Sequence, residues 1–190
     1  MATCILTNLL GTCPSPSFLG GIKDILLINS ADVLSYTYST AAPTQGTVTG
    51  MTLAAGTGFR RFVPTKNTTS AKISRKQNKS KTGGIFEFEV MGEFHEVGMA
   101  NNNWFDQFAK CCDGLTLVIR GNSRSVIVNN VAAAANTLNN PGTVYLTEEE
   151  DSVGADSSNP DDIWKTTFKI SGASTRKWQE FTIAAPVVLP

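Results

Sequence analysis

The sequence predicts a mainly β protein: an antiparallel β-sandwich or barrel with one short flanking helix, a long basic loop and extended termini. Three observations support this fold class. About seven to nine short segments alternate in polarity or are compactly apolar, one segment has helical periodicity, and strands and helices do not alternate along the chain. The 190 residues fit one domain, which we place at residues 22–190 after an N-terminal arm at residues 1–21.

The longest predicted strand, Ile85–Val97, has an aromatic face and an acidic face. One parity carries Phe86, Phe88, Val90 and Phe94, and the other carries Glu87, Glu89, Glu93 and His95. Successive side chains on a strand point to opposite faces. We therefore expect the aromatic face to lie in the core and the acidic face to meet water or a partner that tolerates negative charge.

The remaining elements follow from local patterns. Ile22–Asn29 and Val33–Ser39 are predicted to form a hairpin, because a turn-rich Ser-Ala-Asp step joins them. Apolar residues at three- and four-residue spacing predict a helix at Asn103–Cys112, with an N-cap among Asn101 to Asn103. The other predicted strands are Val48–Leu53, the hairpin Leu115–Arg120 and Ser125–Asn129, Thr143–Thr147, Trp164–Ile170 and Trp178–Ala185.

Charges are segregated although the formal net charge is zero. No acidic residue occurs from Val33 to Phe86, and residues 60–81 hold eight basic ones. No basic residue occurs from Ser125 to Trp164, and residues 148–162 hold seven acidic ones. We interpret these runs as a basic loop at residues 59–84 and an acidic loop at residues 148–162. Opposed basic and acidic patches of this kind are more informative about the partners of the chain than its net charge of zero.

The composition disfavours catalysis, cofactors and metals. His95 is the only histidine and lies on the polar face of a predicted strand. The acidic run lacks the spacing of an EF-hand, and no glycine-rich phosphate loop is present. The cysteines Cys4, Cys13, Cys111 and Cys112 match no zinc pattern, so we expect thiols or disulfides. Neither a signal peptide nor a membrane span is evident, which favours synthesis in a reducing cytoplasm.

The two opposed charge runs favour self-association, because a basic and an acidic segment of one chain can meet between copies. Head-to-tail contacts of unlike surfaces generate rings or filaments. The residues expected at such contacts are Arg60, Arg61, Lys72, Arg75, Lys76, Lys79, Lys81, Glu148, Glu149, Glu150, Asp151, Asp161 and Asp162. One alternative is nucleic-acid binding through the basic stretch, although it offers few aromatic residues for stacking. The other alternative is that both runs are simply solvated loops.

The order of elements resembles that of bacteriophage tail tube proteins. The likeness rests on the stretch 59–84 leading into strand Ile85–Val97, the helix Asn103–Cys112 and the hairpin GLTLVIRGNSRSVIVNN, and the final strands DIWKTTFKISG and RKWQEFTIAA also fit. The resemblance implies a virion protein, assembled in the host cytoplasm, whose β-sandwich subunits form rings that stack into a hollow tail tube. Its partners would be its own copies and other virion proteins, with DNA only as non-specific cargo.

The resemblance also implies roles for individual residues. Glu87, Glu89 and Glu93 would line the lumen, since carboxylates repel DNA phosphates that lysines would hold. Disulfides persist on virion surfaces, so the cysteines could cross-link subunits. Related folds serve elsewhere in particles, and a head–tail connector, neck or capsid accessory protein remains the alternative position.

Overall fold

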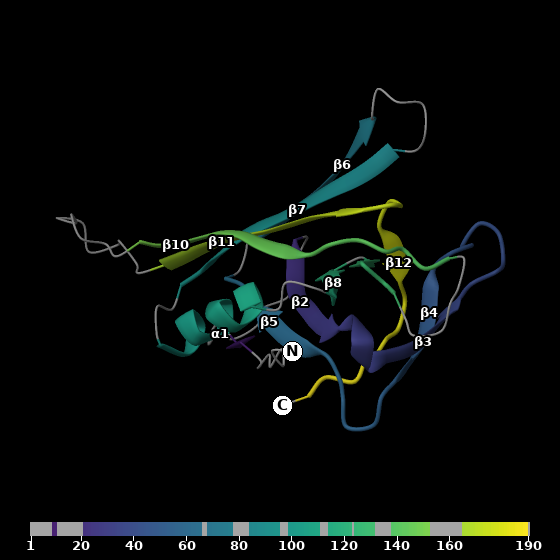
Figure 1. The fold of residues 1–190 in the computed structure, drawn as a ribbon, viewed down its shortest axis with the longest axis horizontal. Helices are drawn as coiled ribbons and strands as arrows, with labels where there is room; N and C mark the ends of the chain where they lie inside the picture. The colour runs from purple at the N-terminus through teal and green to yellow at the C-terminus, as the bar shows by residue number, and fades with distance from the viewer. Residues whose placement is uncertain are drawn as a thin grey trace.

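The structure, a computed structural model, consists of two β-sheets packed face to face with one short α-helix (Figure 1). It describes residues 9–10, 21–65, 68–77, 84–95, 99–110, 114–122, 124–131, 138–152 and 165–189. Nearly all strand pairs are antiparallel. The predicted fold class, a mainly β and sandwich-like protein with one short helix, is confirmed.

The larger sheet has eight strands in the order β1-β5-β2-β8-β9-β12-β4-β3. Their bounds are β1 Leu9–Leu10, β2 Ile22–Asn29, β3 Val33–Tyr38, β4 Val48–Leu53, β5 Arg60–Val63, β8 Leu115–Gly121, β9 Ser125–Val128 and β12 Gln179–Phe181. The expected hairpin after the helix is confirmed, because β8 pairs antiparallel with β9. The last strand is shorter than predicted and ends at Phe181.

The smaller sheet has four strands in the order β10-β11-β7-β6. Their bounds are β6 Ser70–Gln77, β7 Gly84–Phe94, β10 Tyr145–Ser152 and β11 Lys165–Ser174. Strand β7 is the long strand expected from its alternating pattern, and it pairs with both β6 and β11. It therefore lies inside the sheet, while β6 and β10 form its two edges.

The main core fills the space between the two sheets and beneath helix α1 (Met99–Lys110). Phe88, Val90 and Phe94 of β7 are buried there, as expected. Trp104 stacks on Phe62 of β5 with ring centroids 4.7 Å apart. The helix begins at Met99, so the asparagines expected to cap it lie within its first turns instead.

A second core lies on the opposite face of the larger sheet, where β3, β4 and β12 cover β2 and β8. From Ile25 to Ile28, strand β2 is consequently buried on both faces: Ile25 and Leu27 belong to the first core, and Leu26 and Ile28 to the second. The predicted hairpin of Ile22–Asn29 with Val33–Ser39 is wrong, because β2 pairs with β5 and β8 and β3 pairs with β4. A strand buried on both faces is stabilised best between two neighbours in a sheet.

The predicted basic loop at residues 59–84 is also wrong, since much of it forms strands β5 and β6. In β6, Ala71 and Ile73 alternate with polar residues and pack against the main core. That alternation is short and surrounded by lysine and arginine, which masks it in the sequence. Likewise, the predicted acidic loop begins as strand: β10 extends through Ser152 and pairs with the lysine-bearing strand β11.

Candidate functional site

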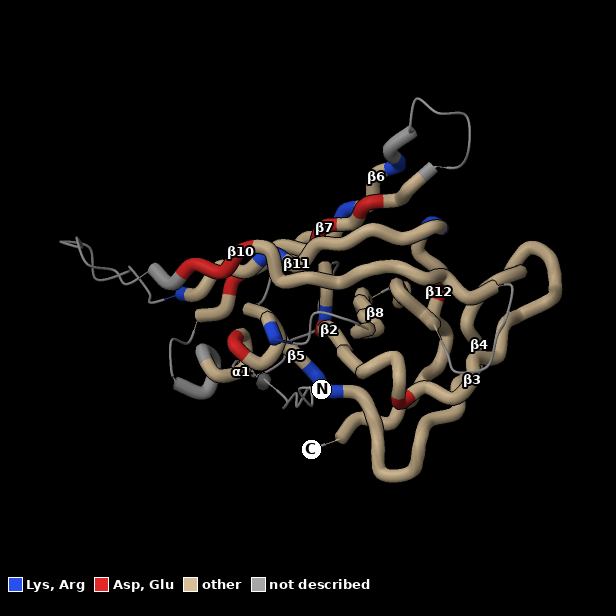
Figure 2. Tube along the Cα trace, in the orientation of Figure 1, with Lys and Arg blue, Asp and Glu red and all other residues tan. Residues whose placement is uncertain are grey.

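The two edges of the smaller sheet carry opposite charge (Figure 2). Strand β6, with the sequence SAKISRKQ, has three basic residues and no acidic one. Strand β10, with the sequence YLTEEEDS, has four acidic residues and no basic one. Lys72 and Arg75 on β6 are exposed, and so are Glu148, Glu149 and Glu150 on β10. The sequence predicted both groups as inter-subunit contacts, and the structure places them on opposite edges of one sheet.

The outer face of this sheet, which points away from the core, carries the three glutamates of β7. Glu87, Glu89 and Glu93 alternate with the buried Phe88 and Val90, as the pattern predicted. Phe86 departs from that prediction: it is only half-buried, and the guanidinium carbon of Arg75 lies 5.9 Å from its ring centroid. It lies near the start of β7, where the β6–β7 hairpin extends beyond the body of the molecule (Figure 1).

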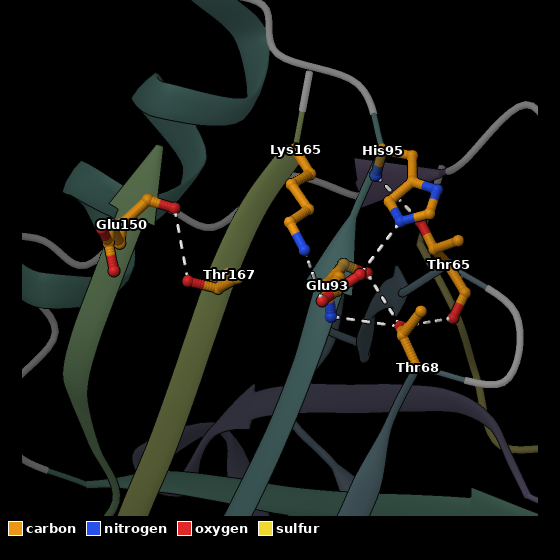
Figure 3. Close-up of polar contacts among 7 residues, drawn as sticks. All are labelled: Thr65, Thr68, Glu93, His95, Glu150, Lys165 and Thr167. Carbon is orange, nitrogen blue, oxygen red and sulfur yellow. Dashed lines mark hydrogen bonds and ion pairs between the residues drawn. The ribbon is translucent and has the colours of Figure 1, made fainter. Parts of the chain in front are cut away.

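Glu93 is held by Lys165, by His95 and by a framework of threonines (Figure 3). Lys165 Nζ donates to Glu93 Oε1 at 2.9 Å, and His95 Nε2 lies 3.1 Å from Glu93 Oε2. Both hydrogen bonds, that of Lys165 first, hold the pKa of Glu93 below its usual value, since they favour the carboxylate. Thr68 Oγ1 accepts from the Glu93 amide at 3.1 Å. This fixes the backbone that positions the carboxylate.

Glu89 and Glu148 share one lysine from the strand between them. Lys169 Nζ lies 3.5 Å from Glu89 Oε2 and 3.9 Å from Glu148 Oε2. Lys72 completes the arrangement, because it lies directly opposite Glu89 in the β6–β7 pairing. The four side chains alternate in sign across the sheet as Lys72, Glu89, Lys169 and Glu148, and we call them the charged row.

The lysines of β11 were missed at the sequence level, although a signal for them was present. Thr166, Phe168 and Ile170 are buried, so Lys165 and Lys169 occupy the outward parity of the same strand. Because of these lysines, the outer face is less acidic than β7 alone suggests. By strand register, its described side chains comprise five carboxylates (Glu87, Glu89, Glu93, Glu148 and Glu150) and three lysines (Lys72, Lys165 and Lys169).

The outer face is hollowed where the charged row crosses it. An open depression of about 540 Å³ is lined by all four members of the row, and Tyr145 and Ser171 also border it. A concave, charged and open surface of this kind suits contact with solvent or a large partner better than enclosure of a small ligand, which usually needs a mostly apolar pocket.

The sequence matches no protein-family model, no curated protein and no solved structure. The physical arrangement of the described residues is therefore the basis for a functional conclusion. In that part of the chain, no helix is long and apolar enough to cross a bilayer. The same residues contain no group of three or more histidine, cysteine, aspartate or glutamate side chains placed to hold a metal ion.

Two predicted contact residues, Arg60 and Arg61, lie in strand β5 of the other sheet. Arg61 Nε donates to Asp24 Oδ2 at 2.6 Å, and Arg120 donates to both oxygens of the same carboxylate. Asp24 is fully buried, so Arg61 and Arg120 pair with a carboxylate inside the fold. This cluster was not predicted from the sequence, where its signal is a lone aspartate in the apolar strand IKDILLIN.

Several predicted site residues fall outside the described part of the chain. They are Lys79, Lys81, Asp161 and Asp162 among the contacts, and Cys4, Cys13, Cys111 and Cys112 among the proposed disulfides. Lys76 and Asp151 belong to strands β6 and β10, but their side chains are not described. The disulfide hypothesis and this portion of the contact set stay predictions.

Proposed function

We propose that this chain is a structural protein whose copies join through the two edges of the smaller sheet, β6 of one copy beside β10 of the next. The observation that carries the proposal is the opposite charge of these edges. An exposed edge strand presents unpaired backbone donors and acceptors, and proteins usually protect such edges from pairing with another chain. Here one edge is basic and the other acidic, which disfavours like-edge contacts and favours unlike ones.

Strand direction supports the same contact. Each neighbouring pair in the smaller sheet is antiparallel, so β6 and β10 run in opposite directions. If neighbouring copies are related by rotation about an axis roughly parallel to the strands, β6 of one copy meets β10 of the next in antiparallel orientation. The alternation of strand direction then continues from one copy to the next. Both strands have eight residues, so neither edge would extend far past the other.

A contact between unlike surfaces is heterologous, and it produces a ring when the rotation closes. We assign the hollowed outer face to the inside of that ring. Glu87, Glu89 and Glu93 then face the lumen together with the lysines of β11. The excess of carboxylates over lysines on this face repels a polyanion in transit, and the lysines moderate the repulsion.

The particular kind of assembly, a bacteriophage tail tube that conducts DNA, rests on the resemblance in element order. In this proposal the rings stack, the protein resides in the virion tail, and other virion proteins contact the tube ends. A connector, neck or capsid accessory ring uses the same edges without extended stacking, so the length of the assembled particle distinguishes these positions.

Electron microscopy of the purified protein, combined with sedimentation velocity, tests the proposal. We expect rings or tubes in wild type and monomers in a Lys72→Glu/Arg75→Glu variant, whose basic edge is reversed. A wild-type protein that stays monomeric at high concentration would refute self-assembly. Tubes of normal length from the variant would refute the role of β6.

DNA binding through the β6–β7 hairpin is the second candidate function. The hairpin carries Lys72 and Arg75 in exposed positions, and it extends from the body of the molecule (Figure 1). A monomer that retards duplex DNA in a gel, with weaker binding as salt rises, would favour this function over assembly.

A further inference from the structure

The charged row suggests how two copies would be aligned. Across the four strands its signs alternate: Lys72 on β6, Glu89 on β7, Lys169 on β11 and Glu148 on β10. The row thus begins with a positive side chain at one edge of the sheet and ends with a negative one at the other. When β6 of one copy is placed beside β10 of the next, the alternation continues without a break.

We propose that Lys72 of one copy forms an ion pair with Glu148 of its neighbour, so that the charged row runs continuously around the ring and sets the register between copies. This inference rests on the proposed function and deepens it, because it names the pair that aligns the two edges. The occupant of the β6 edge is a second copy of this chain.

The exposure of the row supports this assignment. Within the chain, Lys169 is already shared by Glu89 and Glu148, and its side chain is 30% exposed. The Glu148 side chain is 61% exposed, which leaves most of its surface accessible to a further cation. Lys72 is exposed on the opposite edge. The two ends of the row therefore carry accessible charges of opposite sign, which can pair when two copies meet.

The main effect of the Lys72–Glu148 pair is on the register between β6 of one copy and β10 of the next. A one-residue slip between two strands would move each side chain to the other face of the sheet. It would then separate Lys72 from Glu148, because the Lys72 side chain would point to the core-facing side of the sheet while Glu148 stays on the outer face. Exposed ion pairs contribute little to affinity, whereas the juxtaposition of like charges is strongly disfavoured, so the charges also exclude contacts between two β6 edges or between two β10 edges.

Charge reversal with complementation tests the inference. In Lys72→Glu and in Glu148→Lys, every contact between copies pairs like charges, so we expect the concentration needed for assembly to rise ~10-fold or more. An equimolar mixture of the two variants can alternate around a ring, which makes every contact between copies complementary again in an even-membered ring and all but one in an odd-membered ring. We expect the mixture to assemble near the wild-type concentration. Lys23→Glu, the same change on an exposed lysine of β2, serves as the matched control and should assemble normally.

The outcomes separate this inference from the proposed function. If wild type and both single variants assemble alike, the Lys72–Glu148 pair is wrong and edge-to-edge assembly stands. If both variants fold but the mixture does not recover, the pair is also wrong. If wild type itself never assembles, both proposals fall.

Chemical cross-linking of wild type keeps the inference testable should a variant misfold. A carbodiimide joins a lysine directly to a carboxylate, and copies labelled with different nitrogen isotopes reveal links between chains. We expect a mixed-isotope Lys72–Glu148 link, with the Lys169–Glu148 link inside one chain as the internal control. Within one chain, β6 and β10 are about 14 Å apart, three strand spacings, so a link restricted to single chains would contradict the inference.

Discussion

At the scale of single residues, Glu93 shows how the outer face stabilises its carboxylates. Its pKa lies below the usual value near 4.5, first because of the hydrogen bond from Lys165 and then because of His95. A depressed folded-state pKa contributes stability above the unfolded-state value and loses it as the pH falls through the folded-state value. Glu93 therefore opposes unfolding at neutral pH and not in strong acid.

We expect Glu93→Gln to lower the free energy of unfolding at pH 7 by at most ~1 kcal/mol, because the ion pair is partly exposed and screened by solvent. The difference from wild type should shrink as the pH falls below about 4. Urea unfolding at several pH values measures this. Glu180→Gln, at an exposed glutamate of β12, is the control, and a difference that stays constant with pH would argue against the pair.

Replacement of Asp24 is expected to lower the free energy of unfolding more than replacement of Glu93, because Asp24 is fully buried between Arg61 and Arg120. Asp24→Ala leaves two guanidinium groups without their shared carboxylate. We expect a loss of ~3–5 kcal/mol in the free energy of unfolding, the usual effect of removing one partner from a buried ion pair. Thermal and urea unfolding measure it, with Asp32→Asn as the control. A loss below about 1 kcal/mol in the free energy of unfolding would indicate that water hydrates the two guanidinium groups once the carboxylate is removed.

At the scale of elements, the close approach of residues 142–144 to β11 depends on glycine. A Cβ placed on Gly172 would lie 1.8 Å from the Thr143 carbonyl oxygen, a backbone atom that cannot rotate away. This contact lies where the chain leads into β10, so it positions the acidic edge of the smaller sheet.

Gly172→Ala is expected to destabilise the protein by ~1–3 kcal/mol or more, as overpacking in a core does. Gly50→Ala is the matched control within a strand, since its Cβ would make only ordinary contacts with Thr37 at 3.4 Å. Urea unfolding of both variants provides the measurement. Equal stabilities for the two variants would mean that residues 142–144 move away from the added methyl group without loss of stability.

Strands with regular alternation could be predicted from the sequence, and strands with few apolar residues could not. Strand β7 alternates aromatic and acidic residues from Phe86 to Glu89, and the predicted core residues Phe88, Val90 and Phe94 are buried, whereas Phe86 is only half-buried. Strand β6 has only Ala71 and Ile73 to pack inward, so its basic residues dominated the interpretation. Strand pairing was harder still: the partners of β2 lie far along the chain, and local turn signals pointed to β3 instead.

The candidate site was predictable in composition and not in arrangement. The two charge runs were evident, but their placement on opposite edges of one sheet depends on β7 and β11 lying between them. The compensating lysines of β11 also come together with Glu89 and Glu93 only through this pairing. Arg60 and Arg61 show the opposite case, where residues near β6 in sequence belong to another sheet.

At the scale of the whole molecule, the proposed assembly requires that β6 of one copy meets β10 of the next. Hydrogen–deuterium exchange tests this directly, because pairing of two edge strands protects amides that are open to water in a monomer. The comparison is between assembled wild type and the Lys72→Glu/Arg75→Glu variant. Strand β3, an edge of the larger sheet, is the internal reference.

We predict that amides of β6 and β10 exchange at least ~10-fold more slowly in assembled wild type than in the variant, with β3 unchanged. Equal exchange of β6 and β10 in the two samples, or protection confined to β3, would contradict edge-to-edge assembly through the smaller sheet.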